Sequence, residues 1–186
     1  MISIYDLIMA DNSISEEQKR KETEYKQYVD EHVNNVNKAW EQMKNKNMII
    51  DFICAESQTS RSILIPTVDA LVLSHDRSKY GADEWEPYRM HFHSVDDIEK
   101  QSSEAEFERA WEHHYTCNMH HPEHWKDNLD KMPMIYIVEM CCDWIAMSMK
   151  FGGTAYDWYH KNGLVEYNFS ETQKEWLEFI LKNFYK

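Results

Sequence analysis

The stretch MIYIVEMCCDWIAMSMKF, residues 134–151, is the most apolar part of the chain. Pro133 stands directly before it, and Gly152 and Gly153 follow it. Proline is favoured at the start of a helix and glycine after its end, so these residues mark two helix ends. The stretch therefore predicts a central, buried helix on which the other elements pack.

Two carboxylates interrupt this apolar stretch. Glu139 and Asp143 are four residues apart and lie on one face of the predicted helix. A carboxylate next to Cys141, Cys142 and Trp144 is costly to bury unless it is paired with a charge or bound to a metal ion. The central helix therefore carries a candidate site as well as the core.

Helical spacing extends on both sides of the central helix. Residues 15–46 lack glycine and proline, carry apolar side chains at three- and four-residue steps, and begin with the capping pair Ser15 and Gln18. A second capping box, Ser103 to Glu106, is expected to begin another helix. The other expected elements are helices at 63–76, 83–93, 103–118, 154–161 and 170–184, a polar connection at 120–132, and a short strand or loop at 49–61. Glycine and proline number only four each, which favours helices, so we predict one compact all-α domain over residues 1–186 with about six to seven helices.

The chain is acidic, with a net charge of −13 at pH 7. This charge repels a phosphate backbone over most of the surface, so no nucleic-acid polymer is expected as a partner. A small anionic molecule is still an expected partner, because bound metal ions reverse the field locally.

Cysteine spacing and the first residues predict a cytoplasmic protein. The four cysteines form no CxxC pair, and Cys141 and Cys142 lie in the apolar stretch, where free buried thiols are expected. Residues 1–13 have neither a basic region nor a long apolar core, and no run reaches the length of a membrane span. We therefore expect no signal peptide and no membrane partner. The many aromatic residues make a homodimer one expected assembly.

Histidines gather in the second half of the chain. Neutral imidazoles and carboxylates are the usual ligands of zinc, iron, manganese and nickel. Five of the ten histidines fall within a span of twelve residues: His113, His114, His120, His121 and His124. Two alternatives to a catalytic site stay open, namely a structural zinc site at Cys117, His120 and His124, and a solvated histidine run without ligands.

An adjacent pair, His75 and Asp76, strengthens the metal interpretation. The pair lies at the C-terminal end of a predicted buried helix, where the helix dipole favours a cation. At a helix end, two consecutive side chains can turn toward one point. His32 lies on the apolar face of the helix predicted over residues 15–46, where it is either a core histidine or a ligand.

The order of these residues resembles the HD-domain superfamily. It runs from a lone histidine (His32) through a His-Asp pair (His75, Asp76) and later histidines to a late aspartate (Asp143). The superfamily consists of all-helical, metal-dependent enzymes, mostly phosphohydrolases of nucleotides, cyclic nucleotides or related phosphate esters. The resemblance covers residues 25–150, and helices at 154–185 would close the HD-like domain. The blocks HDRSK (75–79) and HHPEHW (120–125) look like an uncharacterised, often phage-encoded family of short HD-like proteins.

The resemblance implies one or two divalent metal ions: iron, manganese, nickel or zinc. Lys79 and Glu139 would be catalytic: Lys79 would stabilise negative charge, and Glu139 or an unligated histidine would deliver a proton. Arg77 and Tyr115 would join Lys79 in binding the substrate. The implied metal ligands are His32, His75, Asp76, His114, His120, His121 and Asp143.

The resemblance therefore predicts an enzyme that hydrolyses a small phosphate ester, such as a nucleotide or cyclic nucleotide, with metal-activated water. One alternative is a di-iron oxygenase that acts on a small polar substrate. The other is a non-catalytic, metal-stabilised binding or inhibitor protein of phage type.

Overall fold

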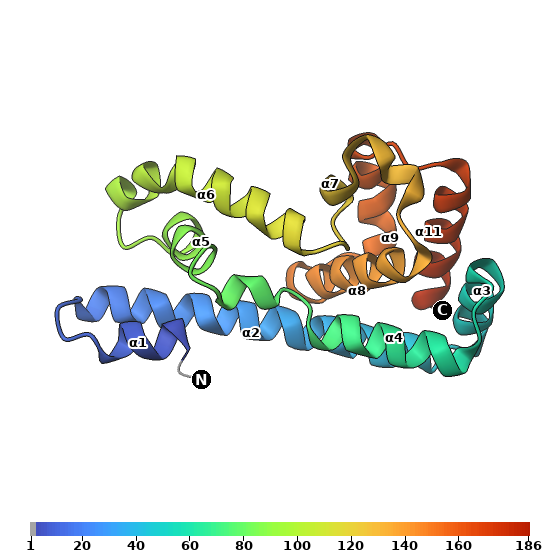
Figure 1. Cartoon of the computed structure of the whole chain (residues 1–186), viewed down its shortest axis with the longest axis horizontal. Helices are drawn as coiled ribbons and strands as arrows, with labels where there is room; N and C mark the ends of the chain where they lie inside the picture. The colour runs from blue at the N-terminus through green and yellow to red at the C-terminus, as the bar shows by residue number, and fades with distance from the viewer. Residues whose placement is uncertain (1–2) are drawn as a thin grey trace. The chain divides into compact units, whose positions relative to one another are not determined.

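The computed structural model describes residues 3–186. Helix accounts for 80% of the chain and no strand occurs among the described residues, which confirms the all-α prediction (Figure 1). The helices outnumber the six to seven predicted, because several are too short to show a periodic pattern. Within residues 3–186, no helix has the length and apolar character needed to cross a membrane.

The fold has two compact units, each made of two separate chain segments. Unit 1 contains the chain up to Glu31 and residues 76–118, and unit 2 contains residues 32–75 and 119–186. The long helix α2 (Glu16–Lys44) contributes residues to both units. It begins as predicted, since Ser15 Oγ accepts a hydrogen bond from the Gln18 N–H at 3.1 Å. A single domain over residues 1–186 stays a prediction.

Unit 1 also contains α1 (Ile4–Ala10), η1 (Arg77–Tyr80), α5 (Trp85–Phe92) and α6 (Asp97–Cys117), and α5 packs along α6 (Figure 1). Buried polar contacts join α5 to its neighbours. The Trp85 indole N–H donates to Glu22 of α2 at 2.7 Å. Arg89 pairs with the same carboxylate at 3.0 Å and with Glu99 of α6 at 2.7 Å. Unit 1 is therefore held by buried ion pairs as well as by aromatic packing.

The start of α6 differs from the prediction. The helix begins at Asp97 because Asp96 caps it, accepting a hydrogen bond from the Glu99 N–H at 2.8 Å. Ser103 lies inside the helix, where its hydroxyl donates to the Lys100 carbonyl at 2.7 Å. The predicted capping box from Ser103 to Glu106 is therefore wrong.

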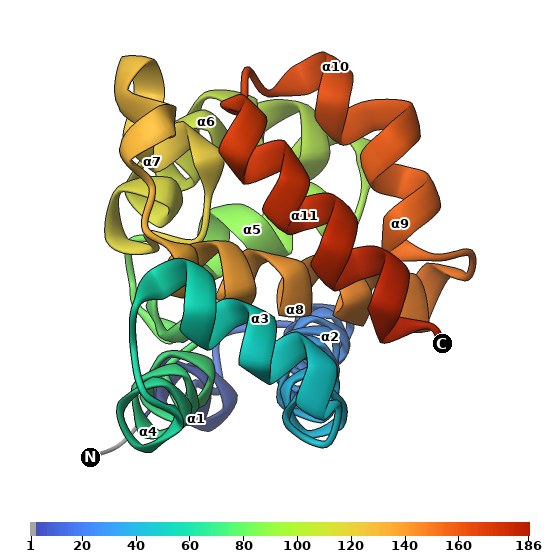
Figure 2. The ribbon, with the colours of Figure 1, turned by 90° about the vertical axis from the view of Figure 1, so that its right-hand side faces the viewer.

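Unit 2 is built around α8 (Met134–Phe151), as the apolar stretch predicted. Helix α8 contacts four other helices of this unit, and Figure 2 shows one of them, α11, lying across it. All members of the large apolar core cluster belong to unit 2. Its remaining elements are α3 (Asn47–Ser57), α4 (Arg61–Leu73), α7 (Pro122–Trp125), η2 (Lys126–Lys131), α9 (Ala155–Trp158), η3 (Tyr159–Gly163), α10 (Leu164–Glu166) and α11 (Glu171–Phe184).

The segment expected to be a strand or loop is helical. Residues 47–57 form α3, whose Ile49, Ile50 and Ile53 are fully buried. β-Branched side chains favour strands weakly, and burial against the core overrides that preference here. The helix is terminated by Gln58, the residue after its end, which adopts the left-handed conformation with φ 53°.

The polar connection predicted at 120–132 contains two short helices, α7 and η2. The Gln173 side chain of α11 fixes η2, because its amide donates to the Leu129 carbonyl at 2.7 Å. Gln173 also completes a capping box with Ser170, so the helix predicted over 170–184 is confirmed. The helix predicted over 154–161 continues through η3 and α10 to Glu166.

Candidate metal centre

Three side chains from separate parts of unit 2 converge. His32 lies on α2, His75 follows the end of α4, and Asp143 lies on α8. The Nε2 atoms of His32 and His75 are 3.3 Å apart, and His32 Nε2 lies 3.2 Å from Asp143 Oδ1. Ligands bound to one ion at about 2.1 Å are separated by about 3.0–3.4 Å in octahedral or tetrahedral geometry. The three side chains could therefore hold a metal ion.

Local helix periodicity explains why the two histidines are buried. Val29 and Val36 flank His32 on one face of α2, and all three are buried. The buried face of α4 includes Val68 and Val72, and His75 continues it three residues later. Both imidazoles are therefore buried because they continue an apolar face of their helix.

A second group surrounds Glu139, one helical turn before Asp143 on α8. Glu139 Oε1 accepts hydrogen bonds from His75 Nδ1 at 3.1 Å and from His120 Nδ1 at 3.3 Å. His120 Nε2 lies 3.9 Å from Asp143 Oδ2. His75, His120 and Glu139 are all buried, and they form another set of possible metal ligands.

Both carboxylates of this cluster favour the anionic form. Burial raises the pKa of Asp143, but its hydrogen bond with His32 and the neighbouring imidazoles outweigh burial and hold the pKa far below its usual range. Burial likewise raises the pKa of Glu139, but hydrogen bonds from His120 and His75 lower it below its usual range. The cluster therefore concentrates negative charge where a cation could bind.

Unit 1 contains a different histidine cluster. His114 Nε2 lies 3.3 Å from Asp76 Oδ1, and His114 Nδ1 donates to Glu84 Oε2 at 2.7 Å. The other oxygen of Glu84 accepts from His113 Nδ1 at 2.7 Å. Lys79 Nζ donates to Asp76 Oδ2, also at 2.7 Å. Asp76 itself adopts the left-handed conformation with φ 54°, which is uncommon for a residue other than glycine.

The predicted site residues fall into both units. Unit 2 brings together His32, His75, His120, Glu139 and Asp143, and unit 1 brings together Asp76, Lys79 and His114. His121 Nδ1 lies 3.9 Å from Glu123 Oε2 in unit 2.

Two predicted substrate contacts have ordinary surroundings. Arg77 is exposed at the start of η1, and Tyr115 packs its ring against Trp111 on α6. The sequence reasoning missed Glu84, which is fully buried and binds two histidines. A single glutamate in an acidic chain gives no pattern that could reveal it. All four cysteines are free, and Cys141 and Cys142 are buried as predicted.

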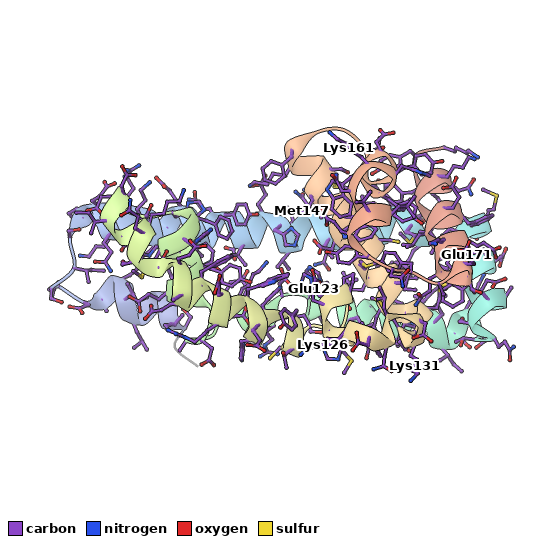
Figure 3. The ribbon with its side chains drawn as sticks, turned by 90° about the horizontal axis from the view of Figure 1, so that it is seen from above. Glu123, Lys126, Lys131, Met147, Lys161 and Glu171 are labelled. Atoms are coloured by element: carbon purple, nitrogen blue, oxygen red, sulfur yellow. The ribbon has the colours of Figure 1, made fainter. Side chains whose placement is uncertain are left out.

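A groove of about 1000 Å³ in unit 2 is lined by residues of η2 and α11. Figure 3 labels three of its lining residues, Glu123, Lys126 and Glu171. Acidic side chains outnumber basic ones along it, so it does not suit an anionic ligand. The charged residues that line it are Glu123, Lys126, Asp127, Asp130, Glu166, Glu171 and Lys174.

Comparison with known proteins identifies a family. No curated protein and no solved structure matches the chain. One family model, described as a family of unknown function (DUF5662), matches residues 21–183 and so spans both units. The match covers most of the chain, including every histidine and carboxylate of the two clusters, and the protein therefore belongs to the DUF5662 family.

Proposed function

We propose that this protein is a metal-dependent hydrolase of a small phosphate ester, with its metal held in unit 2 by His32, His75 and Asp143. The convergence of these three side chains at 3.2–3.3 Å carries the proposal. Two imidazole nitrogens and one carboxylate oxygen suit zinc, iron, manganese or nickel.

The number of ligands supports a catalytic role. Catalytic zinc sites use three protein ligands and leave a position for water or substrate, whereas structural sites use four. A bound ion of this kind supplies a nucleophilic water of lowered pKa and neutralises a phosphate oxygen. His32 and His75 orient the ion through neutral nitrogens, and Asp143 offsets part of its charge.

The charge distribution supports an anionic substrate bound at the metal. The chain has a net charge of −13, and the groove between η2 and α11 is itself acidic. A phosphate ester would therefore need a local cation, and the cluster around Asp143 is where the chain can hold one. The HD-like order of His32, His75, Asp76 and Asp143 supports phosphate-ester hydrolysis over other chemistry.

Elemental analysis of the purified protein tests the metal centre. Wild type should hold stoichiometric metal, and a His75→Ala/Asp143→Ala variant should hold none. His160→Ala is the matched control, because this histidine also pairs with a carboxylate, Glu178, but at the surface. A wild type that stays metal-free after incubation with manganese, iron, nickel or zinc would overturn the proposal, as would full metal content in the double variant.

Hydrolysis of phosphate esters tests the reaction separately. The loaded protein should release phosphate from nucleotides, or an alcohol and a phosphomonoester from a generic phosphodiester, and the double variant should do neither. A loaded protein that hydrolyses none of them refutes the hydrolase while the metal centre stands. Iron content with oxygen consumption and a visible absorption band would instead identify the oxygenase alternative.

A further inference from the structure

Glu139 has an unusual position beside the proposed centre. It is 4% exposed, and its Oε1 atom alone faces two ring nitrogens, His75 Nδ1 at 3.1 Å and His120 Nδ1 at 3.3 Å. His75 and Glu139 are 64 residues apart in sequence, so this contact depends on the tertiary fold of unit 2. One buried carboxylate oxygen therefore joins two histidines from different segments.

The chemistry of these contacts fixes which ring nitrogens carry hydrogen. An ionised carboxylate can only accept hydrogen bonds, so each Nδ1 that faces it must be the donor. An imidazole binds a metal ion in its neutral form, which carries one N–H, and in that form the Nε2 atoms of His75 and His120 hold the lone pairs. A lone pair on nitrogen is what a metal ion needs.

One of these Nε2 atoms belongs to the proposed centre, and the other lies near its carboxylate. His75 Nε2 lies 3.3 Å from His32 Nε2, and His120 Nε2 lies 3.9 Å from Asp143 Oδ2. The rings of His75 and His120 lie side by side, with centroids 4.3 Å apart. The same glutamate thus orients His120 in the same sense as the ligand His75.

We infer that Glu139 is a positioning residue that holds His75 and His120 in the Nδ1–H form and thereby keeps the His75 Nε2 lone pair directed at the metal. The inference rests on the proposed function for the identity of the centre. It gives Glu139 a different task from proton delivery, because its oxygen is engaged with the two rings. A carboxylate behind a metal-binding histidine typically changes metal affinity by about 10–100-fold.

The first measurement needs no metal. Nitrogen-15 NMR of the metal-free full-length protein reports which ring nitrogen carries hydrogen in each histidine. We expect His75 and His120 as Nδ1–H tautomers in wild type and in Glu139→Gln, whose amide oxygen can still accept. Glu139→Leu keeps a similar volume but has no acceptor, so it should lose this tautomer preference. A wild-type spectrum with Nε2–H in either ring overturns the inference.

The second measurement uses Co²⁺ as the probe. Glu139→Leu should bind Co²⁺ about 10–100-fold more weakly than wild type and should lose d–d absorption intensity as His75 is released or misaligned. Glu178→Leu is the matched control, since it removes a carboxylate from His160 at the surface. Unchanged Co²⁺ affinity in the folded Glu139→Leu variant overturns the inference. If wild type binds no Co²⁺ although both rings carry Nδ1–H, the proposed metal centre fails, while the tautomer assignment to Glu139 stands.

Discussion

The buried charged side chains have different partners in the two units. Unit 2 contains the large apolar cluster, and its buried carboxylates Glu139 and Asp143 have imidazole partners. Unit 1 has a smaller set of buried aromatic residues and carboxylates with mixed partners. Arg89 lies beside Glu22 and Lys79 beside Asp76, whereas Glu84 binds two imidazoles. A carboxylate already paired with lysine or arginine has less need of a metal ion. The comparison therefore favours unit 2 as the place of the proposed metal and assigns unit 1 a network of internal polar pairs.

The glutamates of the two clusters sharpen this contrast. Glu84 uses one oxygen for each of two adjacent histidines of α6, at 2.7 Å. Glu139 uses one oxygen for two histidines that are distant in sequence. Both arrangements depend on tertiary folding, but Glu84 binds two neighbours on one helix, whereas Glu139 joins histidines from two chain segments.

The largest expected loss of stability comes from a substitution that breaks the ion pairs of unit 1. Arg89→Met removes the cation between Glu22 and Glu99 and leaves a buried carboxylate without its partner. We expect a loss of about 3–5 kcal/mol in the free energy of unfolding, measured by urea titration. Arg109→Met is the control, because Arg109 pairs with Glu106 on the surface, and it should change stability by less than about 0.5 kcal/mol. Equal effects from both variants would mean that the buried ion pairs do not stabilise unit 1 more than a surface pair does.

A cavity in unit 2 should have a slightly smaller effect. Ile145 on α8 is fully buried in the apolar cluster. Ile145→Ala should cost about 2–5 kcal/mol, because the lost apolar contact and the remaining cavity both destabilise the fold. Ile98→Ala in α6 is the comparison, since Ile98 is 79% exposed and should be nearly neutral. Urea titration measures both, and a neutral Ile145→Ala would mean that unit 2 does not depend on its core.

Metal binding should stabilise wild type through unit 2. A ligand present at 100 times its dissociation constant stabilises the native state by about 2.7 kcal/mol. We expect Zn²⁺ or Mn²⁺ to raise the melting temperature of wild type and to lose this effect in Asp143→Asn, which keeps the shape of the side chain without its charge. Asp127→Asn in the acidic groove is the control and should keep the shift. A shift of equal size in Asp143→Asn would place the ion elsewhere.

The smallest expected effect is a pH dependence from unit 1. Burial lowers the pKa of His114, but the charge and hydrogen bond of Asp76 and the hydrogen bond of Glu84 outweigh burial and raise the pKa above 6.5. A group whose pKa is raised by folding contributes stability that is full below its unfolded pKa and is lost as pH rises through the folded value. The stability of wild type relative to His114→Gln should therefore fall as pH rises above 6.5. Parallel stability curves for the two proteins would show that His114 contributes no such linkage.

Long periodic segments were predictable, and features fixed by single contacts were not. Helices α2, α8 and α11 each carry enough buried positions at helical spacing to be identified from sequence. The start of α6 depends on one cap at Asp96, and α3 depends on burial of isoleucines that favour strands in isolation.

The candidate site was likewise predictable only in part. The resemblance to the HD-domain superfamily implied seven metal ligands, and the structure brings three of them, His32, His75 and Asp143, together in one group. The shared oxygen of Glu139 and the two-sided role of Glu84 depend on side chains from different segments meeting in space. No pattern along a single sequence encodes such a meeting.

The division of unit 2 into two chain segments has a consequence for biosynthesis. A ribosome makes His32 and His75 in the first segment, then the whole second segment of unit 1, and only afterwards the helix that carries Glu139 and Asp143. Domains tend to fold as their chain emerges, so unit 1 can be complete while the two histidines still lack their carboxylates. The nascent chain therefore cannot assemble the cluster of His32, His75 and Asp143 until α8 has been made, and uptake of the proposed ion would have to follow that step.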